Sequence, residues 1–416
     1  MAVAKNLKAA GIRFEVIERN DDVGGIWYYG TPNSSVYDST HLISSKPLTQ
    51  YPDYPMPPSY PHYPGHEQVW AYLRNYARHF QLYPHIRFST EIDKAEPVEG
   101  DGGWEITCSD GQTRRYRGLV IANGHNWDPF WPELPGSFRG PMLHSCQYKT
   151  PDVLRGRRVL VVGAGNSGCD IAVESAQHAA VTFHSTRRGY HYLPKFLCGL
   201  PIDQCGEMLL RWRLPLWLRR AISKLAVRVT LGPPRRVGLP APDHRLFETH
   251  PVINSQLYYY LGHGQVIPKR DIQQLCGDEV LFVDGSREAV DVIILATGFK
   301  ISFPFLDKRY LNWSDGRPGL YLHMVHPTRE NLFVAGMIQP DSGQWGLVDY
   351  QARLITRLIQ LQDAGDPAAS RFRQHMRAAH PSLSAGIRYV SSRRHLLEVE
   401  HFSYRQRLQK LIAQLS

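Results

Sequence analysis

A buried-strand pattern that stops at three closely spaced glycines most constrains what this chain can fold into. The apolar residues 159–162 lead into Gly163, Gly165 and Gly168, spaced as GxGxxG, and a helical segment follows. The first glycine allows a tight turn, the second lets the backbone approach a pyrophosphate, and the third lets helix and strand pack closely. The pattern predicts a dinucleotide site with the pyrophosphate at the helix N-terminus. A glycine-rich turn that binds nothing is the alternative.

The strand after this helix indicates which dinucleotide is bound. The stretch 181–186 (VTFHST) ends at Arg187 and Arg188, where an NAD-binding protein would carry a carboxylate for the ribose 2′-hydroxyl. Guanidinium groups suit a 2′-phosphate, so we expect NADP(H) rather than NAD(H). The competing explanation is that both arginines are solvated loop charges.

The N-terminus has the pattern of the second half of another dinucleotide-binding unit. Residues 2–11 (AVAKNLKAAG) predict a helix, and residues 12–19 (IRFEVIER) alternate like a half-buried strand and end near Glu18. A strand and glycine loop would come before such a helix, and neither is in the sequence. We expect that the glycine loop of this unit is missing because the start is mis-assigned or the gene is truncated.

Two further strands that end in small residues flank the glycine motif, at 118–125 (GLVIANGH) and 290–300 (VDVIILATGFK). Because one lies before the glycine motif and the other after it, these two strands predict that the chain passes from one domain to the other twice. We therefore expect an α/β fold with two Rossmann-like, three-layer dinucleotide-binding domains, one inserted into the other. The inserted NADP domain is predicted over 150–292, and the first domain over 1–149 and 293–416, where it includes C-terminal helices. A helix is also expected near 69–80, and an irregular loop over the proline-rich 46–66.

Composition narrows the classes of partner. Lys and Arg number 48 against 38 Asp and Glu, which favours anionic ligands. The chain has no zinc-finger or aromatic RNA-binding motif, so we expect no nucleic acid. Its six cysteines form no CxxC pair, and no leader precedes them, so a reduced cytoplasmic protein is expected rather than a disulfide reductase. No HExxH or paired Cys/His spacing occurs, and we expect no metal.

Residues 208–229 interleave apolar and cationic side chains. This pattern is typical of a helix that lies on a membrane surface, and peripheral membrane contact is one interpretation. The other is a helical insert packed against its own domain, with arginine stems that cover apolar surface.

A signature ahead of the NADP glycines identifies a family. Phe138 to Tyr148 reads FRGPMLHSCQY, which matches FxGxxxHxxxY/F, and 296–298 (ATG) matches a second signature. With GHNWDP and GMIQP, these blocks make the chain similar to the flavin-containing monooxygenases over nearly its full length. The resemblance implies that FAD and NADP(H) are the cofactors.

The resemblance also implies which residues contact the cofactors. The expected FAD contacts, in the first domain, are Glu18, Gly25, Ile26, Trp27 and Gln339. The expected NADP contacts are Gly163, Gly165, Ser167, Gly168, Cys169, Asp170, Arg187, Arg188, Thr297 and Gly298.

Position 43 departs from the family pattern. The family often has an asparagine where this chain has Ile43, and that asparagine is thought to help hold the oxygenated flavin. Ser44 or Ser45 could supply the hydrogen bond instead, so both are candidate catalytic residues. His144 is the third candidate, although the signature implies that it links the domains.

The function implied is that of an FAD- and NADPH-dependent monooxygenase. NADPH reduces FAD, O₂ adds as a C4a-hydroperoxide, and one oxygen passes to a small soft nucleophile, an amine or a sulfide. Tyr148-Lys149 favours this N- or S-oxygenating branch. A Baeyer–Villiger ketone monooxygenase is the first alternative. The second is a flavin-free remnant that binds only NADP.

Overall fold

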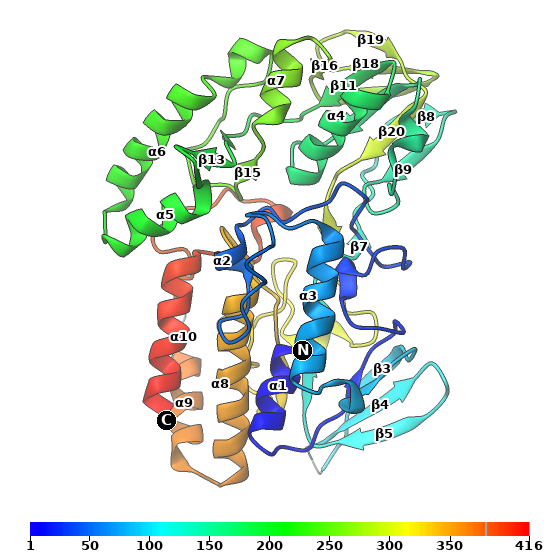
Figure 1. Cartoon of the computed structure of the whole chain (residues 1–416). Coiled ribbons are helices and arrows are strands. Elements are labelled where there is room, and N and C mark those ends of the chain that lie inside the picture. The colour runs from blue at the N-terminus through cyan, green and yellow to red at the C-terminus, as the bar shows by residue number, and fades with distance from the viewer. Residues whose placement is uncertain (101, 379–380, 416) are drawn as a thin grey trace.

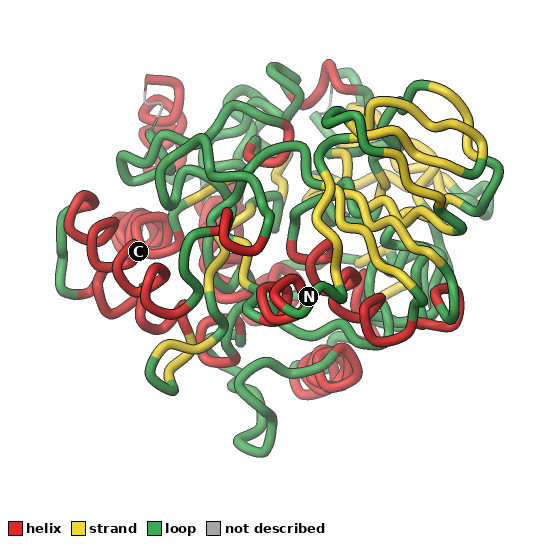
Figure 2. The backbone as a smooth tube through the Cα atoms, turned by 90° about the horizontal axis from the view of Figure 1, so that it is seen from above, coloured by secondary structure: helices red, strands yellow, loops and turns green. Residues whose placement is uncertain are grey.

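The computed structural model describes residues 1–100, 102–378 and 381–415, arranged in two lobes (Figure 1). One lobe is built on a five-stranded parallel sheet, and the other on long helices that run side by side. Seen from above in Figure 2, strands gather on one side of the molecule and the C-terminal helix lies on the other. The predicted α/β class is confirmed.

The parallel sheet has the strand order expected of a dinucleotide-binding fold. Its order is β16-β11-β10-β20-β9. The bounds are β9 Met142–His144, β10 Arg158–Val162, β11 Val181–Ser185, β16 Val266–Lys269 and β20 Val292–Leu295. The first strand after the signature, β10, lies in the centre, and Val159–Val161 are fully buried because both faces of the sheet are covered. The order reverses between β10 and β20, which is where such sheets bind ligands.

Different layers cover the two faces of this sheet. The helices α4 (Asn166–His178) and α7 (Gln256–Gly262) pack on the face that carries Val159 and Val161. The other face, with Leu160, packs against a small sheet, β19-β18-β17-β8. Its strands are β8 Gly136–Phe138, β17 Ile272–Gly277, β18 Glu279–Phe282 and β19 Arg287–Ala289. The three layers are therefore helices, parallel sheet and a second sheet.

The other lobe holds the chain termini and the longest helices. These are α1 Ala2–Ala9, α3 His66–His79, α8 Trp345–Asp363, α9 Pro367–Ala378 and α10 His401–Leu415. Its parallel strands pair separately rather than in one sheet. Among these pairs are β1 (Val16–Ile17) with β2 (Ile86–Arg87), and β6 (Leu119–Ile121) with β22 (Leu332–Val334). A three-stranded antiparallel sheet completes it, with β3 Ile92–Pro97, β4 Trp104–Cys108 and β5 Thr113–Tyr116.

Several short elements connect these parts. They are β7 Asp128–Pro129 with β21 Phe299–Lys300, β12 Tyr192–Leu193 with β15 Val252–Ile253, β13 Phe196–Leu197 with β14 Leu200–Pro201, and β23 Gln339–Pro340 with β24 Glu398–Val399. The expected boundaries at 149/150 and 292/293 stay predictions. The five-stranded sheet includes strands from both sides of these boundaries. Its strand β9 comes before residue 150, and its strand β20 continues past residue 292.

The helices expected near residues 2–11 and 69–80 are confirmed as α1 and α3. The strand predicted over 12–19 is only two residues long, because β1 pairs with β2 over two residues alone. The loop over 46–66 includes one helical turn, α2 (Lys46–Thr49).

The stretch 208–229 lies in two helices, α5 (Ile202–Arg211) and α6 (Leu216–Thr230). The break falls at Pro215, which cannot donate a helical hydrogen bond, and at Arg213, whose φ of 55° is left-handed. In the described part of the chain, no helix is long and apolar enough to cross a bilayer.

A buried ion pair fixes α1 against α8. The Lys5 ammonium lies 2.5 Å from a carboxylate oxygen of Asp349, which is fully buried, and the other oxygen of Asp349 pairs with Arg353 at 2.7 Å. Lys5 also pairs with the partly exposed carboxylate of Asp53 at 2.5 Å, so two cations and two carboxylates form one network around the buried Asp349. Removing one partner of a buried pair costs about 3–5 kcal/mol, because the remaining charge stays desolvated.

We expect Lys5→Met to lower the free energy of unfolding by about 3 kcal/mol, at the lower end of that range because Arg353 still pairs with Asp349. Urea denaturation followed by tryptophan fluorescence measures it. Lys8→Met is the matched control, since the partners of the Lys8 ammonium among the described residues are uncharged: the backbone carbonyls of Phe80 and Gln81 and the side-chain oxygen of Gln81. An equal decrease in the free energy of unfolding for the two variants would show that the buried ion pair stabilises the fold no more than the hydrogen bonds of Lys8 do.

Candidate functional site

The glycine loop after β10 forms a cradle that side chains would fill. A Cβ on Gly163, whose φ is +119°, would lie 2.4 Å from the Ala296 carbonyl oxygen, and one on Gly168 would lie 2.0 Å from the Gly163 oxygen. Both glycines are therefore required by close backbone packing. Gly165 differs, because a Cβ there would meet only the Arg394 guanidinium, at 3.9 Å. The space above Gly165, at the start of α4, fits a pyrophosphate.

The other residues predicted along α4 divide into two kinds. Ser167 is exposed in the first turn, beside the glycines. Cys169 is fully buried, and the Asp170 carboxylate accepts a hydrogen bond of 2.6 Å from the Asn254 amide. The side chains of Cys169 and Asp170 thus have protein surroundings, which leaves the backbone and Ser167 to face a dinucleotide.

The end of β11 carries the two predicted arginines. Arg187 is exposed, and Arg188 pairs with Asp243 at 2.6 Å. Hydrogen bonds from Arg188 and His244 lower the pKa of Asp243 to about 2. Arg188 therefore already has an anionic partner, and a 2′-phosphate would compete with that carboxylate for it.

Two arginines that the sequence interpretation missed lie at the same edge of the sheet. Arg235 and Arg270 line a cavity of about 390 Å³ with residues 238–241. Arg270 follows β16 as Arg187 follows β11, and its carbonyl accepts a hydrogen bond from the Ser185 hydroxyl at 2.7 Å. The sequence does contain a hint of this, because the carboxyl ends of parallel strands lie at one edge of a sheet. An arginine directly after the strand that pairs with β11 is therefore a candidate for the same phosphate.

The predicted FAD residues lie in the other lobe. Glu18 follows β1, where desolvation raises its pKa, and one carboxylate oxygen accepts the Asn20 N–H at 2.9 Å. The Arg19 N–H also donates to this carboxylate. A carboxylate held in this way at the end of a strand fits a ribose hydroxyl. Gly25, Ile26 and Trp27 form a 3₁₀ turn, and a Cβ on Gly25 would meet nothing within 4 Å. These observations fit a nucleotide cofactor beside this turn.

Gln339 is held at both its backbone and its side chain. Its N–H donates to the Leu397 carbonyl and its amide nitrogen donates to the Glu398 carboxylate, each at 2.8 Å. The pairing of β23 with β24 therefore fixes the orientation of the amide. Its role beside the flavin ring stays a prediction.

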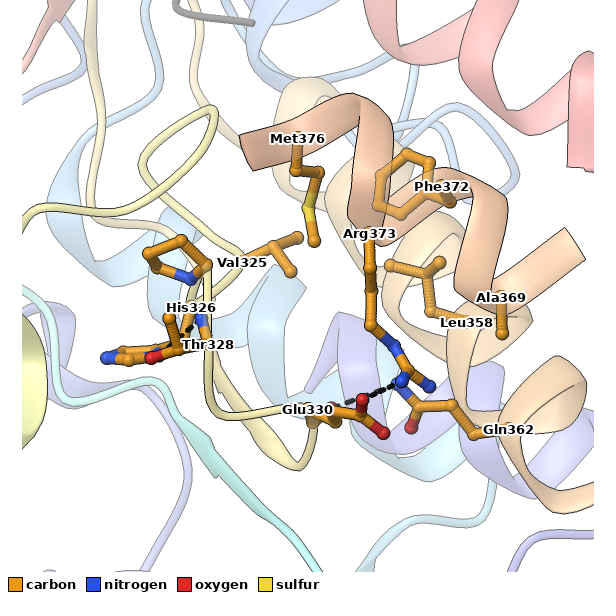
Figure 3. A pocket seen from close by; sticks show the side chains of 11 residues that line it. Val325, His326, Thr328, Glu330, Leu358, Gln362, Ala369, Phe372, Arg373 and Met376 are labelled. Atoms are coloured by element: carbon orange, nitrogen blue, oxygen red, sulfur yellow. Dashed lines mark hydrogen bonds and ion pairs between the residues drawn. The ribbon is translucent and has the colours of Figure 1, made fainter. Parts of the chain in front are cut away.

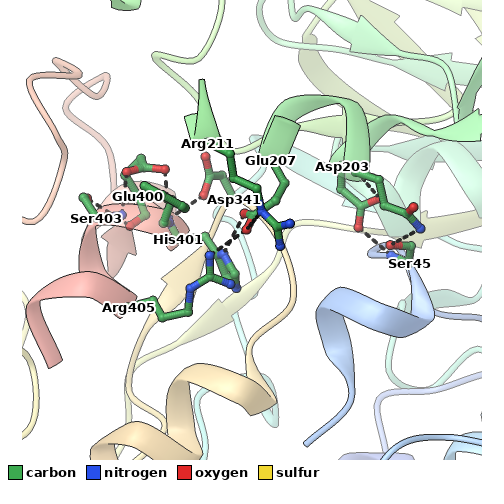
Figure 4. A network of polar contacts seen from close by, with 11 residues as sticks. Ser45, Asp203, Glu207, Arg211, Asp341, Glu400, His401, Ser403 and Arg405 are labelled. Carbon is green, nitrogen blue, oxygen red and sulfur yellow. Dashed lines mark hydrogen bonds and ion pairs between the residues drawn. The ribbon is translucent and has the colours of Figure 1, made fainter. Parts of the chain in front are cut away.

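The two candidate serines already have partners. The Ser44 hydroxyl lies 2.7 Å from that of Thr49, and the fully buried Ser45 receives a hydrogen bond of 3.4 Å from Gln204. The Ser45 N–H donates to the Asp203 carboxylate at 2.6 Å (Figure 4). Ile43, beside them, is 36% exposed. Neither hydroxyl is free in this arrangement to replace an asparagine at position 43.

Helix α5 joins the two lobes above this segment. Asp203 at its start contacts Ser45, and Glu207 one turn later pairs with Arg405 of α10 at 2.6 Å (Figure 4). Burial alone raises the pKa of Glu207, but Arg405, His401 and Arg211 together bring it below its usual value. Ser45 is therefore covered by a helix that the other lobe supplies, whereas Ile43 stays exposed.

His144 lies at the chain crossing between the lobes. Its ring is fully buried, with one nitrogen 3.0 Å from the Gly298 carbonyl oxygen and the other 3.2 Å from the Cys146 sulfur. Desolvation lowers its pKa, which favours the neutral ring. The Thr297 hydroxyl donates to the Phe130 carbonyl at 2.6 Å. His144 and the 296–298 signature thus hold the crossing strands together, which supports a positioning role rather than proton transfer.

A second cavity, between α9 and residues 325–330, has a volume of about 10 Å³ (Figure 3). That is barely the size of one water molecule, so it is not a substrate site. Among the residues that the structure describes, no His, Cys, Asp and Glu side chains cluster as a metal site would require.

Comparison with known proteins decides the family. The model of the flavin-binding monooxygenase-like family matches residues 5–414. The chain belongs to this family. It is 31% identical to flavin-containing monooxygenase 5 of Rattus norvegicus, over 97% of this chain and 78% of the relative. It is also 31% identical to dimethylaniline monooxygenase [N-oxide-forming] 2 of Oryctolagus cuniculus, over 84% of this chain and 69% of the relative.

Solved structures have the same fold. The S-allyl-L-cysteine S-oxygenase of Allium sativum aligns with a TM-score of 0.67 and 21% identity, covering 99% of this chain and 85% of that protein. The structure titled OTEMO complex with FAD and NADP aligns with a TM-score of 0.73 and 19% identity, covering 99% and 95%. Members of this flavin monooxygenase family use FAD and NADPH, so the cofactors and oxidoreductase class predicted from the sequence are confirmed. The flavin-free alternative finds no support.

The open space above Gly165 gives a direct test of the NADP cradle. We expect Gly165→Ala to fold normally, since its φ of −76° suits alanine, and to bind NADP⁺ at least about tenfold more weakly, because the methyl group occupies the phosphate position. Isothermal titration calorimetry measures the Kd, and thermal unfolding measures the fold. Gly168→Ala is the comparison variant and should unfold at a lower temperature. Full NADP⁺ affinity in Gly165→Ala would contradict this placement.

Proposed function

We propose that this monooxygenase transfers one atom of O₂ to the nitrogen or sulfur of a small soft nucleophile, with NADPH as the reductant. The observation that carries the proposal is the 31% identity to an N-oxide-forming dimethylaniline monooxygenase over 84% of the chain. The fold match to an S-oxygenase, at a TM-score of 0.67, is consistent with it.

Bound FAD supplies the redox and oxygen-transfer chemistry, and the residues of the chain hold the cofactors and exclude water. Glu18 and the turn at Gly25–Trp27 would hold FAD in one lobe. The backbone of Gly165 and the start of α4 would hold the NADP pyrophosphate in the other. His144 fixes the strand crossing between the two sites through Gly298. In this proposal the residues of the chain would align two cofactors rather than supply an acid and a base.

Exclusion of water is the second task of the protein. Ser45 is fully buried under α5, and its N–H is satisfied by Asp203. Oxygen transfer in a water-free site avoids loss of the activated oxygen as peroxide. We propose that the cover formed by α5 contributes to this exclusion, while Ile43 replaces the usual polar contact with an apolar surface.

A Baeyer–Villiger reaction is the second candidate. Cyclohexanone monooxygenase aligns with a TM-score of 0.71, and this similarity at 19% identity concerns the fold. Tyr148 and Lys149, which favour the N- or S-oxygenating branch, are both structurally engaged. The Tyr148 hydroxyl donates to Glu174 at 2.6 Å, and Lys149 donates to the carbonyls of Ser34 and Val36 at 2.9 Å.

Product analysis with ¹⁸O₂ separates the candidates. We expect the chain, with NADPH and added FAD, to convert dimethylaniline to its N-oxide and an allyl sulfide to its sulfoxide, each with one ¹⁸O by mass spectrometry. Cyclohexanone should give no lactone above the enzyme-free control. Lactone without N-oxide or sulfoxide would overturn the proposal in favour of the ketone monooxygenase.

We also propose that α6 contacts anionic membrane surfaces. Trp217, Leu225 and Val229 recur at four- and eight-residue intervals on one face of α6 and are 69%, 65% and 77% exposed. The exposed cations Lys224 and Arg228 flank them. Apolar side chains that project beside cations suit an interface of acyl chains and anionic headgroups.

Co-sedimentation with vesicles tests this contact. We expect binding to phosphatidylserine vesicles, much less to phosphatidylcholine vesicles, and at least about tenfold weaker binding for Trp217→Ser/Leu225→Ser, because each side chain contributes about 2 kcal/mol when buried. Val283→Ser is the matched control, since Val283 is exposed elsewhere. Equal binding by the double variant and the control would exclude α6 as the contact.

A further inference from the structure

The C-terminal segment 389–398 crosses from the helical lobe to the NADP lobe. Its Val390 N–H donates to the Glu248 carbonyl at 2.8 Å, and the carboxylate of Glu398 lies 3.1 Å from the His250 ring. Between these two contacts, the Arg394 guanidinium lies over the Tyr190 ring, 5.3 Å from its centre. The segment therefore carries an arginine to the face of the NADP lobe that holds the glycine loop.

The Arg394 guanidinium lies above the glycine cradle itself. One of its nitrogens is 3.9 Å from the position of a Cβ on Gly165, at the open side of the loop. Its charge also acts on the buried thiol of Cys169 in the first turns of α4, where burial raises the thiol pKa and Arg394 opposes that rise. The distance to Gly165 places the cation beside the N-terminus of α4, and its effect on Cys169 is consistent with that position.

Arg394 has no anionic partner among the described residues, unlike Arg188 and Arg405. Arg188 pairs with Asp243, and Arg405 pairs with Glu207. Within residues 1–100, 102–378 and 381–415, no ion pair or hydrogen bond involves the Arg394 side chain, which is half-buried. A half-buried guanidinium held by an aromatic ring and lacking a carboxylate is prepared to bind an anion.

We propose that Arg394 binds the pyrophosphate of NADP(H) from the side opposite the glycine loop and is a binding residue contributed from outside the predicted NADP domain. The proposal rests on the proposed use of NADPH. The backbone N–H groups at the start of α4 would hold one side of the pyrophosphate, and the planar guanidinium the other. Because Arg394 belongs to the segment between α9 and β24, bound dinucleotide would tie the C-terminal segment to the NADP lobe.

The 2′-phosphate and the pyrophosphate can be distinguished by comparing two ligands. NADP⁺ carries both groups, whereas NAD⁺ carries only the pyrophosphate. We expect Arg394→Gln to weaken NADP⁺ and NAD⁺ by the same factor, about 10- to 100-fold, as expected for loss of one charge-assisted hydrogen bond. Arg188→Gln should instead weaken NADP⁺ more than NAD⁺, because Arg188 lies at the 2′-phosphate end. Isothermal titration calorimetry on the FAD-supplemented protein measures each Kd.

Arg393→Gln is the matched control. Arg393 is the neighbouring arginine, is exposed, and stacks on the Phe130 ring at 5.0 Å instead of facing the glycine loop. We expect its Kd for both ligands to stay within about twofold of the original chain. Arg394→Lys, which keeps the charge but not the planar fork, should recover part of the lost affinity. If Arg394→Gln lowers the unfolding temperature, Arg394→Lys becomes the deciding variant.

The outcomes separate this inference from the proposed function. Equal NADP⁺ affinity in Arg394→Gln and the original chain would overturn the role of Arg394 and leave the use of NADPH intact. A loss for NADP⁺ without a loss for NAD⁺ would move Arg394 to the 2′-phosphate and also overturn the pyrophosphate assignment. No NADP⁺ binding by the original chain would instead contradict the proposed function.

Discussion

Three backbone segments meet at one point, and the placement of both proposed cofactor sites depends on this contact. The loop at Gly163 lies against the Ala296 carbonyl, and Gly168 of α4 lies against the Gly163 carbonyl, each so close that a side chain would not fit. Ala296 begins the signature that continues through Gly298 to the strand crossing held by His144. The same backbone contact therefore shapes the nucleotide loop and fixes where the chain leaves that lobe.

The crossing is supported from two sides by segments far apart in the sequence. On one side, α5 reaches from the NADP lobe to Ser45 and Arg405. On the other side, residues 389–398 reach back from the helical lobe to Glu248. Each lobe thus supplies a piece that covers part of the other. The relative position of the two cofactor sites is consequently set by side-chain contacts as well as by the connecting strands.

Local patterns predicted the parts of the structure that are continuous in the sequence. The strand, loop and helix around Gly163 follow one another directly, and their hydrophobic periodicity and glycine spacing were sufficient. The break between α5 and α6 could also have been expected, because Pro215 interrupts the apolar pattern. The strand ending near Glu18 was predicted too long, since strand length depends on a partner that periodicity does not reveal.

The contacts between distant segments could not be predicted in this way. Asp203 satisfies Ser45 from 158 residues away, and no local pattern links them. The position of Arg394 above Gly165 depends on the path of the C-terminal segment across the lobes. Similarly, the sequence marked Ser44 and Ser45 as hydroxyl donors, whereas their partners Thr49 and Gln204 became visible only in the fold.

The three glycines of the loop meet different physical constraints. Gly163 and Gly168 are required by the backbone of the protein itself, so any chain that keeps this fold must keep them, whatever it binds. Gly165 faces open space, and folding alone does not demand it. A side chain at position 165 would therefore leave the architecture intact and fill only the space in which we propose that a nucleotide binds.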